Sequence, residues 1–286
     1  MKIKIFKQKI CIIMFIIFIF DVTAVSDKKY IRIVSLAPSV TSSLYSLGEE
    51  HCVKGITIYC PKGLYKKEII GTLLEFDIEK ISLLSPDLII SDKECNNKMI
   101  IEKLKRLGFE VYVVEIANSF NDICKNYLNL AKKLGKVKSA TKIISISKYL
   151  VEMVYTKLNA LKPTTIFFEV GINPLYTVGN KSFINEYNHY LKTINVYHDI
   201  KLRYFPVSIE DVINRNPNII LLINDKYINI KEKRKWEKYK IINAVKNKKV
   251  FMIDTCILLE PTPLKFAKGL IILEKIIYDK ILNLNE

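Results

Sequence analysis

Two distant stretches of the chain repeat one pattern without a gap. Residues 78–90 read IEKISLLSPDLII, and residues 209–221 read IEDVINRNPNIIL. Ile-Glu opens both stretches, a proline stands at the same place in each, and an aliphatic run follows it. The pattern predicts a short helix, a turn at the proline and a β-strand, twice over. A chain that repeats one such supersecondary unit is expected to fold into two similar lobes.

One long helix is predicted between the two repeated units. Residues 138–161 read KSATKIISISKYLVEMVYTKLNAL and contain no Gly or Pro. Apolar residues recur there at steps of three and four, namely Ile143, Ile146, Tyr149/Leu150, Met153/Val154 and Leu158. This spacing is typical of an amphipathic helix. Pro163 is expected to close it, because proline cannot continue the hydrogen-bond ladder.

Strand and helix patterns alternate on both sides of this helix. Strands are expected at residues 31–36, 53–58, 88–90, 111–114, 165–169, 195–197, 219–223 and 250–253. Residues 171–180 read as a loop, 182–191 as a helix, and 263–284 as the closing helix. Asp77 and Ser208 are expected to cap the two repeated short helices, and Ser39 a helix through Leu47. The alternation predicts an α/β fold with parallel sheets covered on both faces.

The N-terminus has the features of a secretory signal peptide. Lys2, Lys4, Lys7 and Lys9 precede an apolar run at residues 10–20, and Ala24-Val25-Ser26 supplies small residues for cleavage. Cleavage after Ser26 would give an exported, periplasmic protein, with an uncleaved membrane anchor as the alternative. The predicted division is residues 1–26 as signal peptide, 27–137 as the N-terminal lobe, 138–161 as the interlobe helix and 162–286 as the C-terminal lobe.

Charge and composition exclude several functions. The net charge of +16 comes from scattered lysines, with no basic run interleaved with aromatics, so nucleic-acid binding is not expected. The sequence has no GxGxxG, Walker, HExxH or GxSxG motif. Removal of Cys11 leaves an odd number of cysteines, and no disulfide can be assigned among Cys52, Cys60, Cys95, Cys124 and Cys256. Their spacing is not that of a zinc site, so no metal site and no cofactor are predicted.

The loops after the predicted strands are the expected binding site. Ligands of open parallel sheets lie beyond the carboxyl ends of the strands. The loops at those ends are residues 37–39, 59–61, 171–179 and 255–261. Tyr59, Tyr176, Tyr204 and Phe205 could supply aromatic walls for a large planar ligand, with ordinary packing as the alternative for each.

Six segments together resemble a known family. They are RIVSLAPSVTSSLYSLG, VKGITIYCP and IEKISLLSPDLII in the first lobe, and GINPLYTVGNKSFI, YFPVSIEDVINRNPNIILL and KWEKYKIINAVKNKKVFMID in the second. They are similar, in order, to the periplasmic substrate-binding proteins of ABC importers for cobalamin, haem and ferric siderophores. The resemblance implies two Rossmann-like lobes with parallel sheets, joined by a single long interlobe helix in the manner of helical-backbone metal receptors. It implies a ligand held between the lobes.

The resemblance also implies a function. The chain would bind a cobalt- or iron-containing chelate, cobalamin first and haem or a ferric siderophore as alternatives. As a monomer, it would deliver this small-molecule ligand to an ABC permease dimer with its ATPase subunits. Less favoured are an exported chelatase-like enzyme and a ligand sensor.

Particular residues carry this resemblance. Tyr59 matches a ligand-contacting tyrosine of cobalamin-binding members, and Tyr204 stands where they have a tryptophan. The second ligand-contacting segment aligns with Cys256, Ile257, Leu258, Leu259 and Glu260, although the first three replace acidic and aromatic residues, which weakens cobalamin as the specific ligand. For Glu260, a salt bridge at the rim is the alternative to a ligand contact. Glu79 and Glu210 match permease-docking glutamates, with stabilisation of the helix dipole as the alternative.

Overall fold

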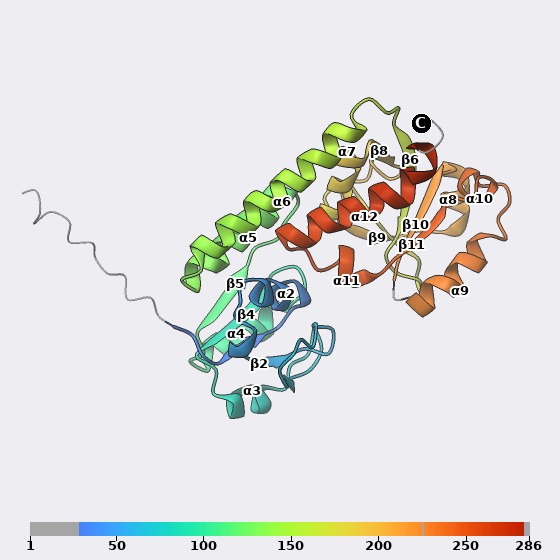
Figure 1. Cartoon of the computed structure of the whole chain (residues 1–286). Helices are drawn as coiled ribbons and strands as arrows, with labels where there is room; N and C mark the ends of the chain where they lie inside the picture. The colour runs from blue at the N-terminus through green and yellow to red at the C-terminus, as the bar shows by residue number, and fades with distance from the viewer. Residues whose placement is uncertain (1–28, 225, 283–286) are drawn as a thin grey trace, which may run out of the picture.

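The computed structural model describes residues 29–224 and 226–282, and the predicted signal peptide lies outside these ranges. The chain forms two α/β lobes beside a layer of long helices (Figure 1). Within the described residues, no helix is both long enough and apolar enough to cross a membrane.

The N-terminal lobe is built on a parallel sheet in the order β3-β2-β1-β4-β5. The strands are β1 (Ile33–Ser35), β2 (Val53–Ile56), β3 (Glu68–Ile69), β4 (Leu88–Asp92) and β5 (Val111–Val114). The helices α2 (Pro38–Ser46) and α5 (Phe120–Lys133) bury their apolar side chains on one face. The helices α3 (Ile78–Leu84) and α4 (Lys98–Arg106) cover the other.

The C-terminal lobe repeats this plan with a parallel sheet in the order β11-β10-β6-β8. Its strands are β6 (Thr164–Glu169), β8 (Thr193–Asn195), β10 (Ile219–Ile223) and β11 (Val250–Ile253), and β7 (Tyr176–Val178) pairs antiparallel with β9 (Tyr204–Pro206). The 3-10 turn η2 (Phe183–Glu186) leads into α7 (Tyr187–Leu191), which lies on one face with α12 (Pro263–Leu282). The other face carries α8 (Ile209–Arg215), α9 (Lys226–Trp236) and α10 (Asn243–Lys246).

The repeat seen in the sequence is a repeat of structure. Both α3 and α8 have seven residues, and the side chains of Asp77 and Ser208 cap them as predicted. Each helix ends at a left-handed residue, Ser85 with φ 45° and Asn216 with φ 44°, immediately before the proline. The strands that follow, β4 and β10, both lie between two neighbours in their sheets. The two lobes therefore use the same helix-turn-strand unit at the same place.

The interlobe helix is α6 (Val137–Leu158), which ends ahead of Pro163 as expected. Its buried stripe differs from the predicted one, because Ile146, Tyr149 and Met153 are exposed. The fully buried positions are Ala140, Ser147, Val151, Val154 and Leu158. The small residues Ala140 and Ser147 lie on the packed face, and hydrophobicity alone does not reveal such positions.

The two ends of α6 belong to different cores. Ala140 lies in the N-terminal core, whereas Val151, Val154 and Leu158 lie in the C-terminal core. Ile144, between them, packs against both. Helices α5 and α12 flank α6 along its length (Figure 1). The connection between the lobes is therefore a packed helix.

Local differences from the sequence prediction follow from tertiary pairing. The predicted loop at residues 171–180 contains β7, because β9 supplies its hydrogen-bonding partner. The strand expected at residues 195–197 is β8, which ends at Asn195. The predicted helix at residues 182–191 is split between η2 and α7. All five cysteines in the described ranges are free thiols, so no disulfide is present there.

Candidate functional site

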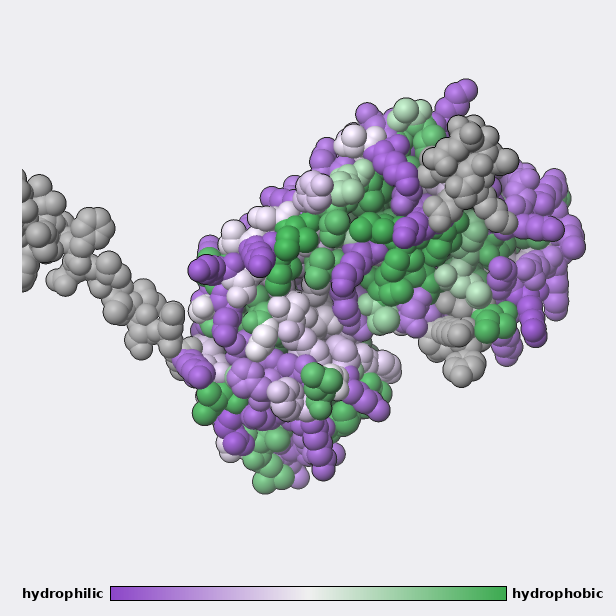
Figure 2. All heavy atoms as spheres, viewed as in Figure 1, coloured by the Kyte–Doolittle hydropathy of each residue, from purple (hydrophilic) through white to green (hydrophobic). Residues whose placement is uncertain are grey.

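A cleft of about 590 Å³ lies between the lobes, and Figure 2 shows the surface hollowed there. Both lobes line it, largely with residues near the carboxyl ends of strands, as expected for parallel sheets. The lining residues are Pro38, Ser39, Tyr59, Leu73, Asp92, Glu94 and Cys95 from the N-terminal lobe, and Val170, Gly171, Tyr176, Phe183, Tyr204, Thr255, Leu259, Glu260 and Pro261 from the C-terminal lobe.

All three predicted tyrosines line this cleft, from both lobes. Tyr59 follows β2 and is 58% exposed, so its ring is available to a ligand. Tyr176 and Tyr204 come from paired strands of the opposite lobe. Burial, and then the nearby Glu94 carboxylate, raise the pKa of Tyr204, so its hydroxyl stays protonated. An aromatic surface on both walls suits a large planar ligand.

Phe205 does not line the cleft. Side chains alternate across a strand, so Phe205 points to the opposite side of the ribbon from its neighbour Tyr204. Its ring packs edge-on against Tyr197, with the ring centroids 5.5 Å apart, beside the C-terminal core. Phe205 was expected to form part of an aromatic wall because the alternation of side chains along the strand was not taken into account.

Of residues 256–260, some line the cleft and the others do not. Its start is a single helical turn, α11 (Thr255–Leu258), so only one side of the turn can face the cleft. Leu259 and Glu260 line the cleft, whereas Ile257 and Leu258 pack into the C-terminal core. Cys256 is exposed but lies outside the lining. The aligned segment therefore contributes its second half.

The carboxylate of Glu260 already has partners in both lobes. It accepts a hydrogen bond from the Ser42 hydroxyl of α2 at 2.6 Å, and it pairs with the Lys265 ammonium of α12. Lys265 also donates to the Ser42 oxygen at 2.9 Å. This geometry favours the salt-bridge alternative, because Glu260 ties the lobes together at the edge of the cleft.

The sequence prediction missed the loop after β4. This strand runs to Asp92 instead of Ile90, and the residues that follow bring Glu94 and Cys95 to the cleft. The usable signal was the polar run from Ser91 to Glu94 directly after an aliphatic strand, because residues beyond the carboxyl ends of parallel strands line the ligand site. Ser39, expected to cap α2, instead donates its hydroxyl hydrogen to Asp92 at 2.8 Å, while Ala37 takes the cap position.

The acidic side chains of this loop are hydrogen-bonded. Asp92 also accepts from the Glu94 N–H at 2.9 Å, and burial raises the pKa of the Asp92 carboxyl. Oε1 of Glu94 accepts two hydrogen bonds from Arg203 of the other lobe, from Nε at 3.0 Å and from Nη2 at 2.6 Å. Burial outweighs this guanidinium and raises the pKa of Glu94. Arg203 also donates to the carbonyl of Ala117 at 3.0 Å, which strengthens the tie between the lobes.

The cleft has a one-sided charge. Among the described residues that line it, three are acidic and none is Lys, Arg or His. The cations nearest to the acids, Arg203 and Lys265, are held in ion pairs. An anionic ligand would therefore meet no free cation among the described residues that line the cleft. The geometry suits an uncharged or cationic ligand with a broad apolar face.

The two predicted docking glutamates lie outside the cleft lining. Glu79 and Glu210 are exposed in the first turns of α3 and α8, at equivalent places in the repeated unit. The backbone N–H of Glu210 and the Ser208 hydroxyl lower the pKa of the Glu210 carboxyl. In the cap of α8 the Ser208 hydroxyl accepts the Asp211 N–H at 3.1 Å, and the Asp211 carboxylate accepts a hydrogen bond from Tyr197 at 2.8 Å.

Comparison with known proteins gives one consistent family. Residues 33–255 match the family model described as periplasmic binding protein. An uncharacterised ABC transporter substrate-binding lipoprotein of Bacillus subtilis is 28% identical over 82% of this chain and 75% of its own length. A vitamin B12-binding protein of Vibrio cholerae is 26% identical over 81% of this chain and 84% of its own length.

A solved structure is similar over the same region. It is that of a possible iron-binding (periplasmic solute-binding) protein from Staphylococcus epidermidis, with a TM-score of 0.73 and 28% identity. The match covers 88% of this chain and all of that one.

Proposed function

Because this chain belongs to the periplasmic binding protein family, we propose that it is the extracytoplasmic substrate-binding component of an ABC importer. It captures a metal chelate in the interlobe cleft and delivers it to a permease. The observation that carries this proposal is the cleft itself, with tyrosines from both lobes facing a common space. The names of the Bacillus and Vibrio relatives support the transport role.

Cobalamin is the ligand that we favour. Its corrin carries uncharged amide side chains around a broad ring, and the described part of the cleft lining offers aromatic surface and no free cation. Haem has two carboxylates, which would meet acidic side chains instead of cations. A ferric siderophore complex without net negative charge is the second candidate, because its charge also fits the cleft.

Calorimetric titration of the purified protein with cyanocobalamin, haemin and ferric siderophores of different charge tests this proposal. We expect tight binding of cyanocobalamin and weaker binding of the anionic chelates. Preference for haemin or an anionic siderophore would contradict the charge argument. Failure of every chelate to bind would contradict the proposed function.

The cleft supports a binding role better than a catalytic one. A chelatase-like enzyme needs a carboxylate that is free to take protons from its substrate. Glu94 and Glu260 both have cationic partners, and Asp92 accepts from Ser39 and from the backbone. A sensor that binds the same ligand without a permease is distinguished by transport measurements with the importer.

Export and docking complete the proposal. The predicted signal peptide would place the protein in the periplasm, where it acts as a monomer. Glu79 and Glu210, one in each lobe, are proposed to meet arginines of the two permease subunits. A carboxylate–arginine pair is strong and directional, and a pseudo-symmetric protein offers one such anchor to each half of a two-fold partner.

A further inference from the structure

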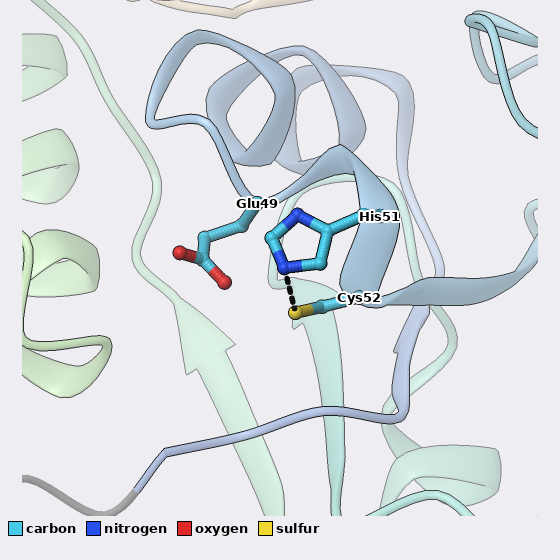
Figure 3. A group of neighbouring side chains, drawn as sticks. All are labelled: Glu49, His51 and Cys52. Atoms are coloured by element: carbon cyan, nitrogen blue, oxygen red, sulfur yellow. Dashed lines mark hydrogen bonds between the residues drawn. The ribbon is translucent and has the colours of Figure 1, made fainter.

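We propose that Glu49, His51 and Cys52 form a zinc-binding site on the N-terminal lobe, separate from the cleft. These residues occupy the turn between α2 and β2, where the 3-10 turn η1 (Glu50–Cys52) follows Glu49. One ligand atom from each side chain lies within 4.8 Å of the other two. Figure 3 shows that the Glu49 carboxylate, the His51 ring and the Cys52 sulfur converge.

The spacing of the donor atoms suits a tetrahedral metal. Sγ of Cys52 and Nε2 of His51 are 3.3 Å apart. Two ligands of a tetrahedral zinc ion, each bound at about 2.0–2.3 Å, lie roughly 3.5 Å from one another. The imidazole and the sulfur are therefore almost at coordinating separation. A small side-chain rotation of Glu49 would complete three protein ligands.

The ligand types select the metal. Zinc accepts thiolate, imidazole and carboxylate together, whereas magnesium and calcium prefer oxygen ligands. Zinc binding would break the S–H bond of Cys52, form a Zn–S bond and release the thiol proton to solvent. The carboxylate and the thiol are buried, but His51 is exposed. A water molecule can thus supply the fourth ligand from the solvent side.

Two lysines orient Glu49 and fix the turn that carries His51 and Cys52. Lys136, at the start of α6, pairs with Oε1 of Glu49 at 2.5 Å. A carboxylate has several acceptor positions, so this pair can orient Glu49 while another position binds the metal. The Lys54 ammonium donates to the His51 carbonyl at 2.8 Å, which fixes the turn. The spacing of the cysteines did not predict this zinc site, because only one of its three ligands is a cysteine and the other two are a carboxylate and a histidine.

Metal titration of the full chain tests this site. After treatment with a chelator, the protein is titrated with Zn²⁺ against a chromophoric competitor, and with Co²⁺ to detect the near-ultraviolet band of a cobalt–thiolate bond. We expect one ion per chain and a thiolate band. His51→Gln and Cys52→Ser should each weaken Zn²⁺ binding by more than about 100-fold, since loss of an outer partner alone costs about 10- to 100-fold.

Matched controls separate this site from adventitious binding. His189→Gln and Cys256→Ser remove an exposed histidine and an exposed cysteine elsewhere, and should leave Zn²⁺ affinity and the cobalt band unchanged. Because Cys52 is buried and its variant can fail to fold, the exposed His51 provides the decisive variant. Absence of Zn²⁺ binding, absence of the thiolate band, or full affinity in His51→Gln would overturn the proposal.

Discussion

Tyr59 is the single side chain expected to contribute most to ligand affinity. It leaves the end of β2 with an exposed ring at the cleft. Tyr59→Ala should weaken chelate binding by about 1–3 kcal/mol, which is roughly 5- to 150-fold, because one aromatic contact is lost. Titration calorimetry with cyanocobalamin measures this change.

The matched control for Tyr59 is Tyr65. Tyr65 is 56% exposed on the adjacent loop but does not line the cleft. Tyr65→Ala should bind like the unaltered protein. Equal affinities for Tyr59→Ala and Tyr65→Ala would remove Tyr59 from the binding site.

The buried carboxyl of Glu169 should make the free energy of unfolding depend on pH. This carboxyl is fully buried at the end of β6 and accepts the Trp236 indole N–H at 2.6 Å. Burial raises its pKa from 4.5 to about 7. Because the pKa is higher in the folded state than in the unfolded state, the protonated carboxyl stabilises the folded state. This stabilisation is complete below pH 4.5 and is lost as the pH rises through 7. At about 1.4 kcal/mol per pKa unit, the loss is roughly 3 kcal/mol.

Glu169→Gln keeps an acceptor for Trp236 and removes the ionisation. Its free energy of unfolding, relative to the unaltered protein, should be higher at pH 8 than at pH 4 by about 3 kcal/mol. Urea unfolding, followed by Trp236 fluorescence, measures the free energy of unfolding of both proteins at each pH. Glu237→Gln, at an exposed site, is the control and should show no such difference. Parallel pH curves for Glu169→Gln and the unaltered protein would contradict the argument.

At the scale of elements, the equivalence of α3 and α8 leads to the docking prediction. The helices share length, cap position, left-handed end and following strand, and each displays one exposed glutamate in its first turn. Combining Glu79→Ala with Glu210→Ala should leave ligand affinity unchanged but abolish the stimulation of transport by the reconstituted importer. Each change removes a carboxylate proposed to pair with a permease arginine.

The control for this pair also has one glutamate in each lobe. Glu68 and Glu237 are exposed and lie outside the two repeated helices. Glu68→Ala combined with Glu237→Ala removes the same net charge and should support normal transport. If the Glu79 and Glu210 double variant also transports normally, the docking role is wrong and the helix-dipole explanation stands.

At the scale of the whole molecule, the lobes are expected to move little when ligand binds. Helix α6 is packed into both cores, so a hinge motion would have to disturb both. Two further ties cross between the lobes, from Arg203 to Glu94 and from Glu260 to Ser42. Small-angle scattering profiles of free and loaded protein should nearly superimpose. A large compaction on loading would contradict the rigid connection.

The sequence by itself determined the α/β fold and its two-lobed plan. The signals were local ones: apolar runs, proline positions and the repeat at residues 78–90 and 209–221. Each reflects a preference of the backbone for helix, turn or strand, and the tertiary structure did not override it. The caps at Asp77 and Ser208 were predictable for the same reason, since a cap is a contact within one turn. Tyr59 and Tyr176 were expected at the cleft because they lie in loops predicted to follow strands, whereas Tyr204 was supported by the family resemblance.

Only the tertiary structure decided which neighbouring side chains face the cleft. Tyr204 faces it, whereas Phe205 packs against Tyr197, because the pairing of β9 with β7 sets the register of the ribbon. Likewise, the burial of Ala140 and Ser147 on α6 depends on helices distant in sequence. Glu94 meets Arg203 only when the lobes come together. Such contacts join residues far apart in the chain, and no local pattern of residue types specifies them.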